Sequence, residues 1–333
     1  MQRPRVRTKA GTEAELPIYR QLQSPEAMPQ AALARMVRGV STRDYEGVVD
    51  VAREGFGVAK SSVSRAFVKA TAEGVKQLSE RKLDQERFLA IFVDGVEYAG
   101  ETLIVALGVT DQGEKRILGV RQGGTENSAV CIALFEDLQT RGLPTDRPML
   151  FVLDGSKALH SAVKKVWGEK ALIQRCQIHK RRNVLAHLPG KHHAECVRQL
   201  SLAYQETSYE AALKQLKLTA SWLDRLNPDA AASLREGMEE TLTVVKLGLP
   251  PALQRTFVTT NPIESAFSVV RRVTSRVTRW RDGNMRLRWC SAGLLRAEQK
   301  FRRIKGYKQI QQLELALKRK SSDSTPESKR KSA

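Results

Sequence analysis

The chain has 333 residues, with 56 Lys and Arg against 36 Asp and Glu, and its net charge of +20 favours a polyanionic partner such as nucleic acid. A protein that only coats RNA seldom carries so much patterned apolar sequence, and basic residues spread over several segments disfavour an acidic membrane surface. The four cysteines are irregularly spaced, the N-terminus lacks a signal peptide's apolar segment, and no apolar stretch is long enough to span a membrane, so we expect a protein of the reducing cytoplasm.

The first 85 residues contain two predicted parts. Residues 1 to about 35 are polar and rich in proline, and we expect weak order there. Residues 36–85 show two helical patterns separated by a glycine-containing turn, which predicts a helix-turn-helix. In a less basic protein, a helical hairpin with a solvated face would be the better interpretation. The expected DNA contacts on the outer face of the second helix, which starts near Lys60, are Ser61, Ser62, Arg65 and Lys69.

From Arg87 onwards the sequence predicts strands. An apolar run at 88–93 ends in Asp94, and runs at 102–110 and 116–120 follow after turn residues. A helix is predicted over 127–141, and a fourth apolar run at 149–153 ends in Asp154. This order over residues 86–183 predicts an α/β fold with a ribonuclease H-like mixed sheet. In that topology the first and fourth strands lie side by side and parallel.

The rest of the chain changes character twice. Residues 184–255 follow helical spacing without strand signals, which predicts an all-α insertion. The core should resume over 256–317, where Asn261, Pro262 and Glu264 are residue types that favour a helix start. Residues 318–333 are rich in Lys, Ser and Pro, and we expect a disordered basic tail.

Asp94 and Asp154 carry the chemical argument. Each follows an apolar run and precedes a glycine, and neighbouring parallel strands would bring their carboxylates together. Carboxylate oxygens suit Mg²⁺, and such a pair can hold two Mg²⁺ (or Mn²⁺) ions that activate a nucleophile and stabilise a leaving oxygen. Either aspartate alone could simply cap an Asp-Gly turn. The repetition of the unit at matching positions favours the metal site.

Glu264 would supply a third carboxylate from the helix that begins at Asn261. Its spacing also fits a capping box, in which the Glu264 side chain bonds the backbone N–H of Asn261. Both roles can hold together. The predicted catalytic and metal-binding residues are therefore Asp94, Asp154 and Glu264.

Cys176 and His179 form a Cys-x-x-His pair behind another apolar run, and they raise the question of zinc. The further ligands would be His192 or His193 and Cys196. The sequence disfavours zinc, because the linking segment is basic and neither Cys-x-x-Cys nor His-x₃-His occurs. We expect Cys176 and His179 to be a structural pair that orients nearby basic residues towards phosphate.

A basic segment closes the ordered part of the chain. Thirteen Lys or Arg and only two acids lie between Arg271 and Lys308, with Trp280, Trp289 and Tyr307 interleaved. This composition is typical of a surface that tracks phosphates and stacks on unpaired bases. A solvated helix pair with structural tryptophans is the alternative. The phosphate contacts expected in this basic segment are Arg271, Arg272, Arg276, Arg279 and Arg281. Those expected beside Cys176 and His179 are Arg175, Lys180 and Arg182.

The chain resembles the Mutator-type transposases of bacterial insertion sequences. The residues that carry the resemblance are 39–45, 61–65, Phe92-Val-Asp-Gly95, Leu153-Asp-Gly155, 174–183 and Thr259-Thr-Asn-Pro-Ile-Glu-Ser265. The family has an Asp-Asp-Glu triad on a ribonuclease H-like fold, which implies that Asp94, Asp154 and Glu264 are the triad. Members usually carry a further segment before the Arg-Pro-Arg-Val-Arg sequence at residues 3–7, so we expect a truncated chain or an internal start.

The resemblance implies an enzyme that binds double-stranded DNA at the terminal inverted repeats of its element. With Mg²⁺ it would free a 3′-hydroxyl and join it to target DNA, and the joining of two ends implies at least a homodimer. The alternative is a truncated regulator that occupies the element ends without cutting, and a structure-selective nuclease comes third. We expect a location in the bacterial cytoplasm, at the nucleoid, and no membrane partner.

Overall fold

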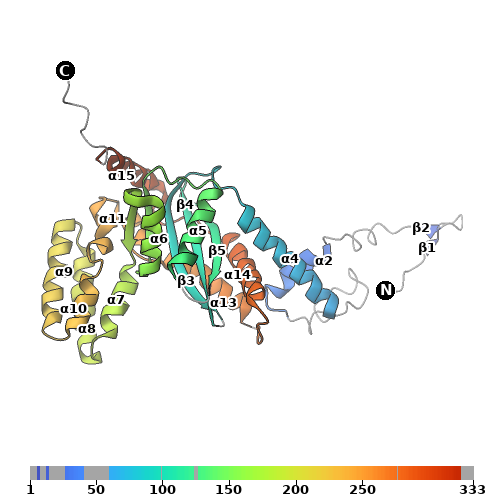
Figure 1. The fold of residues 1–333 in the computed structure, drawn as a ribbon, viewed down its shortest axis with the longest axis horizontal. Helices are drawn as coiled ribbons and strands as arrows, with labels where there is room; N and C mark the ends of the chain where they lie inside the picture. Colours follow the sequence, from blue (N-terminus) through green and yellow to red (C-terminus); the bar gives the residue numbers. More distant parts are fainter. Residues whose placement is uncertain are drawn as a thin grey trace, which may run out of the picture. The chain divides into compact units, whose positions relative to one another are not determined.

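The computed structural model describes residues 6–7, 13–14, 27–40, 60–98, 100–123, 127–275 and 277–323. Two compact units make up the chain, and Figure 1 gives the labels of their helices and strands. Unit 1 comprises Met1–Ser79 and Ala266–Gln299, and unit 2 comprises Glu80–Ser265 and Lys300–Ala333. The second boundary falls inside a helix, α13 (Asn261–Thr274). Each unit is described by itself.

Unit 2 is built on a five-stranded mixed sheet with the strand order β5-β4-β3-β6-β7. Its strands are β3 (Phe88–Tyr98), β4 (Glu101–Thr110), β5 (Lys115–Gly123), β6 (Met149–Leu153) and β7 (Ala171–Arg175). The first three strands pair antiparallel, whereas β3 with β6 and β6 with β7 pair parallel. The predicted mixed α/β architecture and the parallel pairing of the first and fourth strands are thereby confirmed.

The strand β3 runs further than the sequence indicated. Asp94 was expected at its end, but β3 continues to Tyr98, and Asp94 pairs with Val105 of β4. The extension follows from the long antiparallel ladder with β4, which Val96 stabilises as a buried side chain. Asp94 therefore does not cap a turn. It lies beyond Val93, which pairs with Leu153, the last residue of β6.

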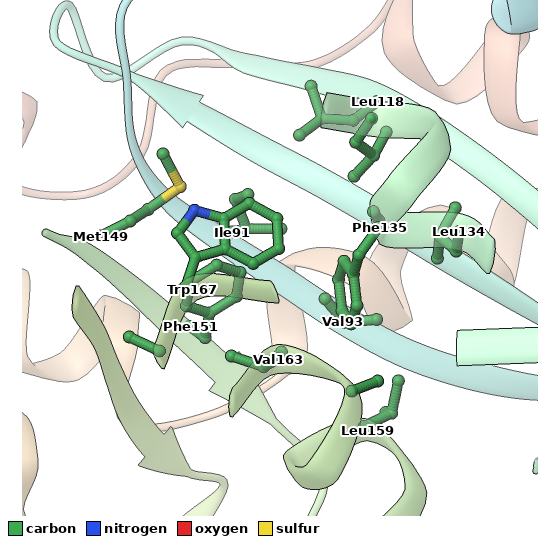
Figure 2. Packing of buried hydrophobic residues seen from close by; sticks show 14 of the residues in the cluster. Ile91, Val93, Leu118, Leu134, Phe135, Met149, Phe151, Leu159, Val163 and Trp167 are labelled. Carbon is green, nitrogen blue, oxygen red and sulfur yellow. The ribbon is translucent and has the colours of Figure 1, made fainter. Parts of the chain in front are cut away.

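One face of the sheet packs against α5 (Ser128–Thr140) and α6 (Lys157–Trp167). Figure 2 shows this core, in which Phe135 of α5 and Trp167 of α6 meet Phe151 of β6. Ile91 and Val93 of β3 point into the same cluster. Because strand side chains alternate between faces, Phe92 and Asp94 belong to the opposite face.

That opposite face is covered near the site by α12 (Pro251–Phe257). The rings of Phe92 and Phe257 stack with their centroids 5.7 Å apart. Both residues are fully buried, as expected for a parallel-sheet strand with an apolar run covered on both sides. The helix α13 begins four residues after α12 ends, and it starts on the side of the sheet where Asp94 lies.

Helices account for the regular structure from Gln177 to Phe257, which includes the predicted insertion. After α7 (Gln177–Ala186) come α8 (His193–Gln205), α9 (Tyr209–Asp224), α10 (Pro228–Arg235), η4 (Glu239–Leu242) and α11 (Thr243–Lys246). The helices α7 to α10 lie together and share an apolar core (Figure 1). The buried Gln174 side chain ties the edge strand β7 to η4 and α11, since it donates to the Thr241 carbonyl at 2.8 Å and accepts from the Val244 N–H at 2.9 Å.

Unit 1 contains α2 (Ala27–Met36), α4 (Lys60–Glu80) up to Ser79, the later turns of α13, and α14 (Gly283–Glu298). The helix α4 begins where the second helical pattern was predicted and buries Val63, Phe67 and Ala70 as expected. The first helix of the predicted helix-turn-helix lies outside the described residues. Weak order over 1–35 was wrong for residues 27–35, because α2 buries Ala32 and its single proline, Pro29, sits in the first turn, where a proline needs no helical hydrogen bond.

The C-terminal helix α15 (Ile310–Asp323) also extends beyond the expected boundary. The disordered tail was predicted from residue 318, but the helix continues to 323, since Leu313, Ala316 and Leu317 are buried and Lys318 pairs with Glu314. Across the described parts of the chain, no helix has both the length and the apolar character needed to cross a membrane.

Candidate metal centre

The strand register brings Asp94 and Asp154 to the same end of two paired strands. Asp94 of β3 and Asp154 behind β6 each follow one member of the Val93–Leu153 pair. Asp94 is 5% exposed and accepts a hydrogen bond from the Gly95 N–H at 2.9 Å. Asp154 is partly exposed and accepts from the Ser156 N–H at 2.9 Å, so the turn role proposed for it is present as well.

Glu264 lies in the first turn of α13, and the residue that caps this helix differs from the one that the sequence predicted. The Thr260 carbonyl accepts the Ile263 and Glu264 N–H groups, both at 3.0 Å, so Thr260 occupies the capping position assigned to Asn261. The prediction that Asn261 caps the helix is therefore wrong by one residue. Instead, the Glu264 Oε1 lies 3.2 Å from the Thr260 hydroxyl.

Asp94, His179 and Glu264 form a group whose ligand atoms all lie within 4.8 Å of one another. No other such group of potential metal ligands occurs among the described residues, and Asp154 does not belong to this one. His179 comes from α7, and its Nε2 lies 3.8 Å from the Glu264 Oε1. The sequence singled out His179 as part of a structural pair. Its place among the acidic side chains was missed, because spacing along the chain does not reveal which way α7 faces.

The acidic side chains act on one another electrostatically. The pKa of Asp94 is raised to about 7, first by burial and then by the negative charges of Asp154 and Glu264, while the nearby His179 opposes this rise. The pKa of His179 is raised to about 9, first by its hydrogen bond with Cys176 and then by the nearby negative charges. Such crowding of carboxylates leaves negative charge for a cation to neutralise, and their oxygens are the ligands that Mg²⁺ prefers.

Cys176 is fully buried directly behind β7, where its N–H donates to the Leu153 carbonyl at 2.7 Å. The cysteine therefore directly follows β7, the strand next to the one that precedes Asp154. Its Sγ accepts a hydrogen bond from the Thr260 N–H at 3.4 Å. Of the other residues considered for zinc, His193 bonds the Leu188 carbonyl, and Cys196 is buried within the core of the helical bundle.

Two of the expected phosphate contacts are internal. Lys180 is 3% exposed, and its Nζ donates to the carbonyls of Ser233 and Glu236, both at 2.6 Å. Arg175 is 7% exposed, and its Nε donates to Glu240 at 2.8 Å. These partners argue against phosphate contacts: Arg175 ties β7 to η4, and Lys180 ties α7 to the C-terminal end of α10. Arg182, in contrast, is exposed.

The buried position of Lys180 predicts a pH effect on stability. Burial, followed by the charge of Arg175, lowers the pKa of Lys180 to about 8, against roughly 10.4 in an unfolded chain. Between these values the unfolded chain binds a proton that the folded protein does not, so the free energy of unfolding should rise with pH by roughly 2–3 kcal/mol. Lys180→Met should lack this rise in urea denaturation between pH 8 and 10.5. Lys170→Met, at an exposed site, serves as the control, and parallel curves for wild type and Lys180→Met would contradict the assignment.

The remaining predicted DNA contacts lie mostly on exposed surface. Ser61, Arg65 and Lys69 of α4 are exposed and Ser62 is partly so, while Arg276 lies outside the described residues. Of the contacts expected in the later basic segment, Arg271, Arg272, Arg279 and Arg281 are exposed. Trp289 is 8% exposed and packs on Phe67 with ring centroids 4.5 Å apart, which favours a structural role over base stacking.

Comparison with known proteins gives one consistent result. The model of the family described as "Transposase, Mutator family" matches residues 4–303. The chain is 31% identical over 269 residues to the transposase for insertion sequence element ISRM5 of Rhizobium meliloti (strain 1021), and the match covers 77% of this chain and 65% of that protein. It is 33% identical over 174 residues to the transposase for element IST2 of Acidithiobacillus ferrooxidans, covering 52% and 57%. The chain therefore spans less than two thirds of the length of both relatives.

Proposed function

Because the chain belongs to the Mutator family of transposases, we propose that it binds the terminal inverted repeats of an insertion sequence, cleaves DNA there and transfers the freed end to target DNA. The catalytic residues would be Asp94, Asp154 and Glu264, on a ribonuclease H-like sheet. The observation that carries the proposal is the approach of Asp94 and Glu264 to within 4.8 Å, from elements that are 170 positions apart in sequence, next to Asp154.

We assign Asp94, Asp154 and Glu264 as the residues that would hold two Mg²⁺ or Mn²⁺ ions, because carboxylate oxygens are the ligands that these ions prefer. The raised pKa of the Asp94 carboxyl supports this assignment, because a bound divalent cation would offset both the cost of burying the carboxylate and the repulsion from Asp154 and Glu264. Bound ions would supply Lewis-acid activation of the nucleophile and stabilisation of the leaving oxygen. We place His179 beside the ions instead of among their ligands, since Mg²⁺ prefers oxygen.

The proposed reaction has two steps that balance without a further reactant. A water oxygen first attacks the phosphorus at the element end, the bond to the 3′-oxygen breaks, and a 3′-hydroxyl is freed. That hydroxyl then attacks a phosphodiester of the target, so one phosphodiester bond forms as another breaks. No covalent bond between protein and DNA is required.

Double-stranded DNA would contact the exposed basic residues of α4, of the last turn of α13 and of the segment that follows α13. The net charge of +20 supports this assignment, because Lys and Arg that neutralise phosphates supply most of the sequence-independent affinity for DNA. Joining two element ends calls for at least a dimer on DNA. A protein that acts on a bacterial genome would work in the cytoplasm, at the nucleoid.

Incubation of the full chain with labelled element ends in Mg²⁺ tests the proposal, with Asp154→Asn as the comparison. We expect both proteins to bind the ends and only the wild type to cleave them. Binding without cleavage by the wild type would favour the non-cleaving regulator. Equal cleavage by the two proteins would remove Asp154 from the catalytic site, and equal binding of unrelated DNA would argue against recognition of the repeats.

A further inference from the structure

The hydroxyl of Thr260 lies at the junction of three side chains from two parts of unit 2. Its Oγ1 is 3.2 Å from the Glu264 Oε1, 3.3 Å from the His179 Nδ1 and 3.6 Å from the Cys176 Sγ. Thr260 itself is fully buried. A buried hydroxyl with three polar neighbours is held in place, and it restricts the orientation of the group that accepts its hydrogen bond.

The hydrogens can be assigned from what each group can donate. The Thr260 N–H donates to the Cys176 Sγ at 3.4 Å. A hydroxyl has one hydrogen to give, and a carboxylate can only accept, so the Thr260 hydroxyl donates to Glu264. The His179 Nδ1 then carries a hydrogen and donates to the Thr260 oxygen. This direction leaves the Nε2 edge of His179 turned towards the carboxylates.

The backbone of the same residue fixes the helix that carries Glu264. The Thr260 carbonyl accepts the first hydrogen bonds of α13, from the N–H groups of Ile263 and Glu264. Two residues earlier, the Val258 carbonyl accepts from the Gln177 N–H at 2.9 Å, at the start of α7. The start of α13 is thus tied to the Cys176–His179 region by both side-chain and main-chain bonds.

We propose that Thr260, clamped by Cys176 and His179, is the positioning residue that holds the Glu264 carboxylate in the orientation needed to bind a divalent metal ion. The inference rests on the proposed function, in which Glu264 is a ligand. The proposal also gives the Cys-x-x-His pair a structural role, because Cys176 and His179 hold Thr260 in place through its N–H and hydroxyl groups. Mg²⁺ demands near-ideal octahedral geometry, so a ligand free to rotate would bind it less tightly.

The test measures metal binding directly, with the full chain and MnCl₂ as the probe. Thr260→Val keeps the shape of the side chain and removes the hydroxyl, whereas Thr260→Ser keeps the hydroxyl. We expect Thr260→Val to weaken Mn²⁺ binding about tenfold, as the loss of a hydrogen bond to a metal ligand typically does, and Thr260→Ser to stay within about threefold of wild type. Loss of the free Mn²⁺ signal in electron paramagnetic resonance gives the dissociation constant.

Two comparisons separate positioning from a general loss of stability. Leu200→Ala, in the core of the helical bundle, destabilises unit 2 away from the site and should leave Mn²⁺ affinity unchanged. In cleavage assays, Thr260→Val should need more Mn²⁺ for half-maximal rate and recover most of the maximal rate at saturation. Should Thr260→Val fail to fold, Thr260→Ala and Thr260→Ser make the same comparison with a smaller side chain.

The outcomes distinguish this inference from the proposed function. If Glu264→Gln loses Mn²⁺ affinity while Thr260→Val binds like the wild type, the carboxylate is a ligand but Thr260 does not position it. If Glu264→Gln and the wild type bind Mn²⁺ equally, Glu264 is no ligand and both ideas fall. Equal weakening by Thr260→Val and Thr260→Ser would overturn the role of the hydroxyl.

Discussion

Replacement of Asp94 with asparagine is expected to lower Mg²⁺-dependent cleavage of labelled element ends by at least about 10³-fold. The amide keeps the size of the side chain and can still accept the Gly95 N–H, but it carries no negative charge. Asp146→Asn is the matched control, because Asp146 lies exposed in the loop before β6. Cleavage by Asp94→Asn within tenfold of wild type would remove Asp94 from the reaction.

The same substitution should stabilise the metal-free protein in a pH-dependent way. The pKa of Asp94 is about 7 in the folded protein and roughly 4 in an unfolded chain. Between these values the folded protein holds a proton that the unfolded chain has released, so the free energy of unfolding falls as the pH rises, by roughly 2–4 kcal/mol. Asp94→Asn should lack this fall in denaturant titrations with a chelator, and added Mg²⁺ should restore stability only to the wild type.

Glu264→Gln is expected to fold like the wild type and to lose cleavage by at least about 10³-fold. The first turn of α13 depends on the Thr260 carbonyl and not on the Glu264 carboxylate, and glutamine can still accept the Thr260 hydroxyl. Glutamine is nevertheless a poor Mg²⁺ ligand because it is neutral. The melting temperature should therefore stay within about 2 °C, which corresponds to less than 1 kcal/mol.

The control for this variant is Glu169→Gln, at an exposed glutamate in η2 (Gly168–Lys170). Both proteins should bind labelled ends equally, and only Glu264→Gln should fail to cut them. A wild-type cleavage rate in Glu264→Gln would contradict the assignment of the third carboxylate. A large drop in melting temperature would instead show that the side chain contributes to the fold.

The sheet was predictable because its pattern is local. The runs at 88–93 and 149–153 are apolar at every position, which is typical of a strand covered on both faces. The alternation of side chains between the two faces then follows from strand geometry. The helix start at Asn261 could be predicted to within one residue from its residue types. The capping residue itself could not be predicted from residue types, because it depends on which carbonyl accepts the first N–H groups of the helix.

The roles of Lys180 and His179 could not be predicted, for one shared physical reason. The two residues are adjacent on α7, yet Lys180 points into the helical bundle and His179 towards the carboxylates. From sequence alone, a lysine in a basic segment is expected to face solvent. The carbonyl groups that Lys180 bonds instead lie more than 50 positions away in sequence, so no local pattern indicates them. Tertiary partners, and not residue type, decided both cases.

The pairing of Val93 with Leu153 has a consequence for how this chain can vary. Side chains alternate along β3, so a deletion or insertion of one residue within 88–93 would exchange its two faces. Asp94 would then enter the apolar layer occupied by Ile91 and Phe151, and an apolar side chain would take its place in the acidic group. Apolar residues in this segment can therefore be exchanged for one another, whereas its length cannot change. The number of residues in β3 before Asp94 therefore decides which face of the sheet carries the carboxylate.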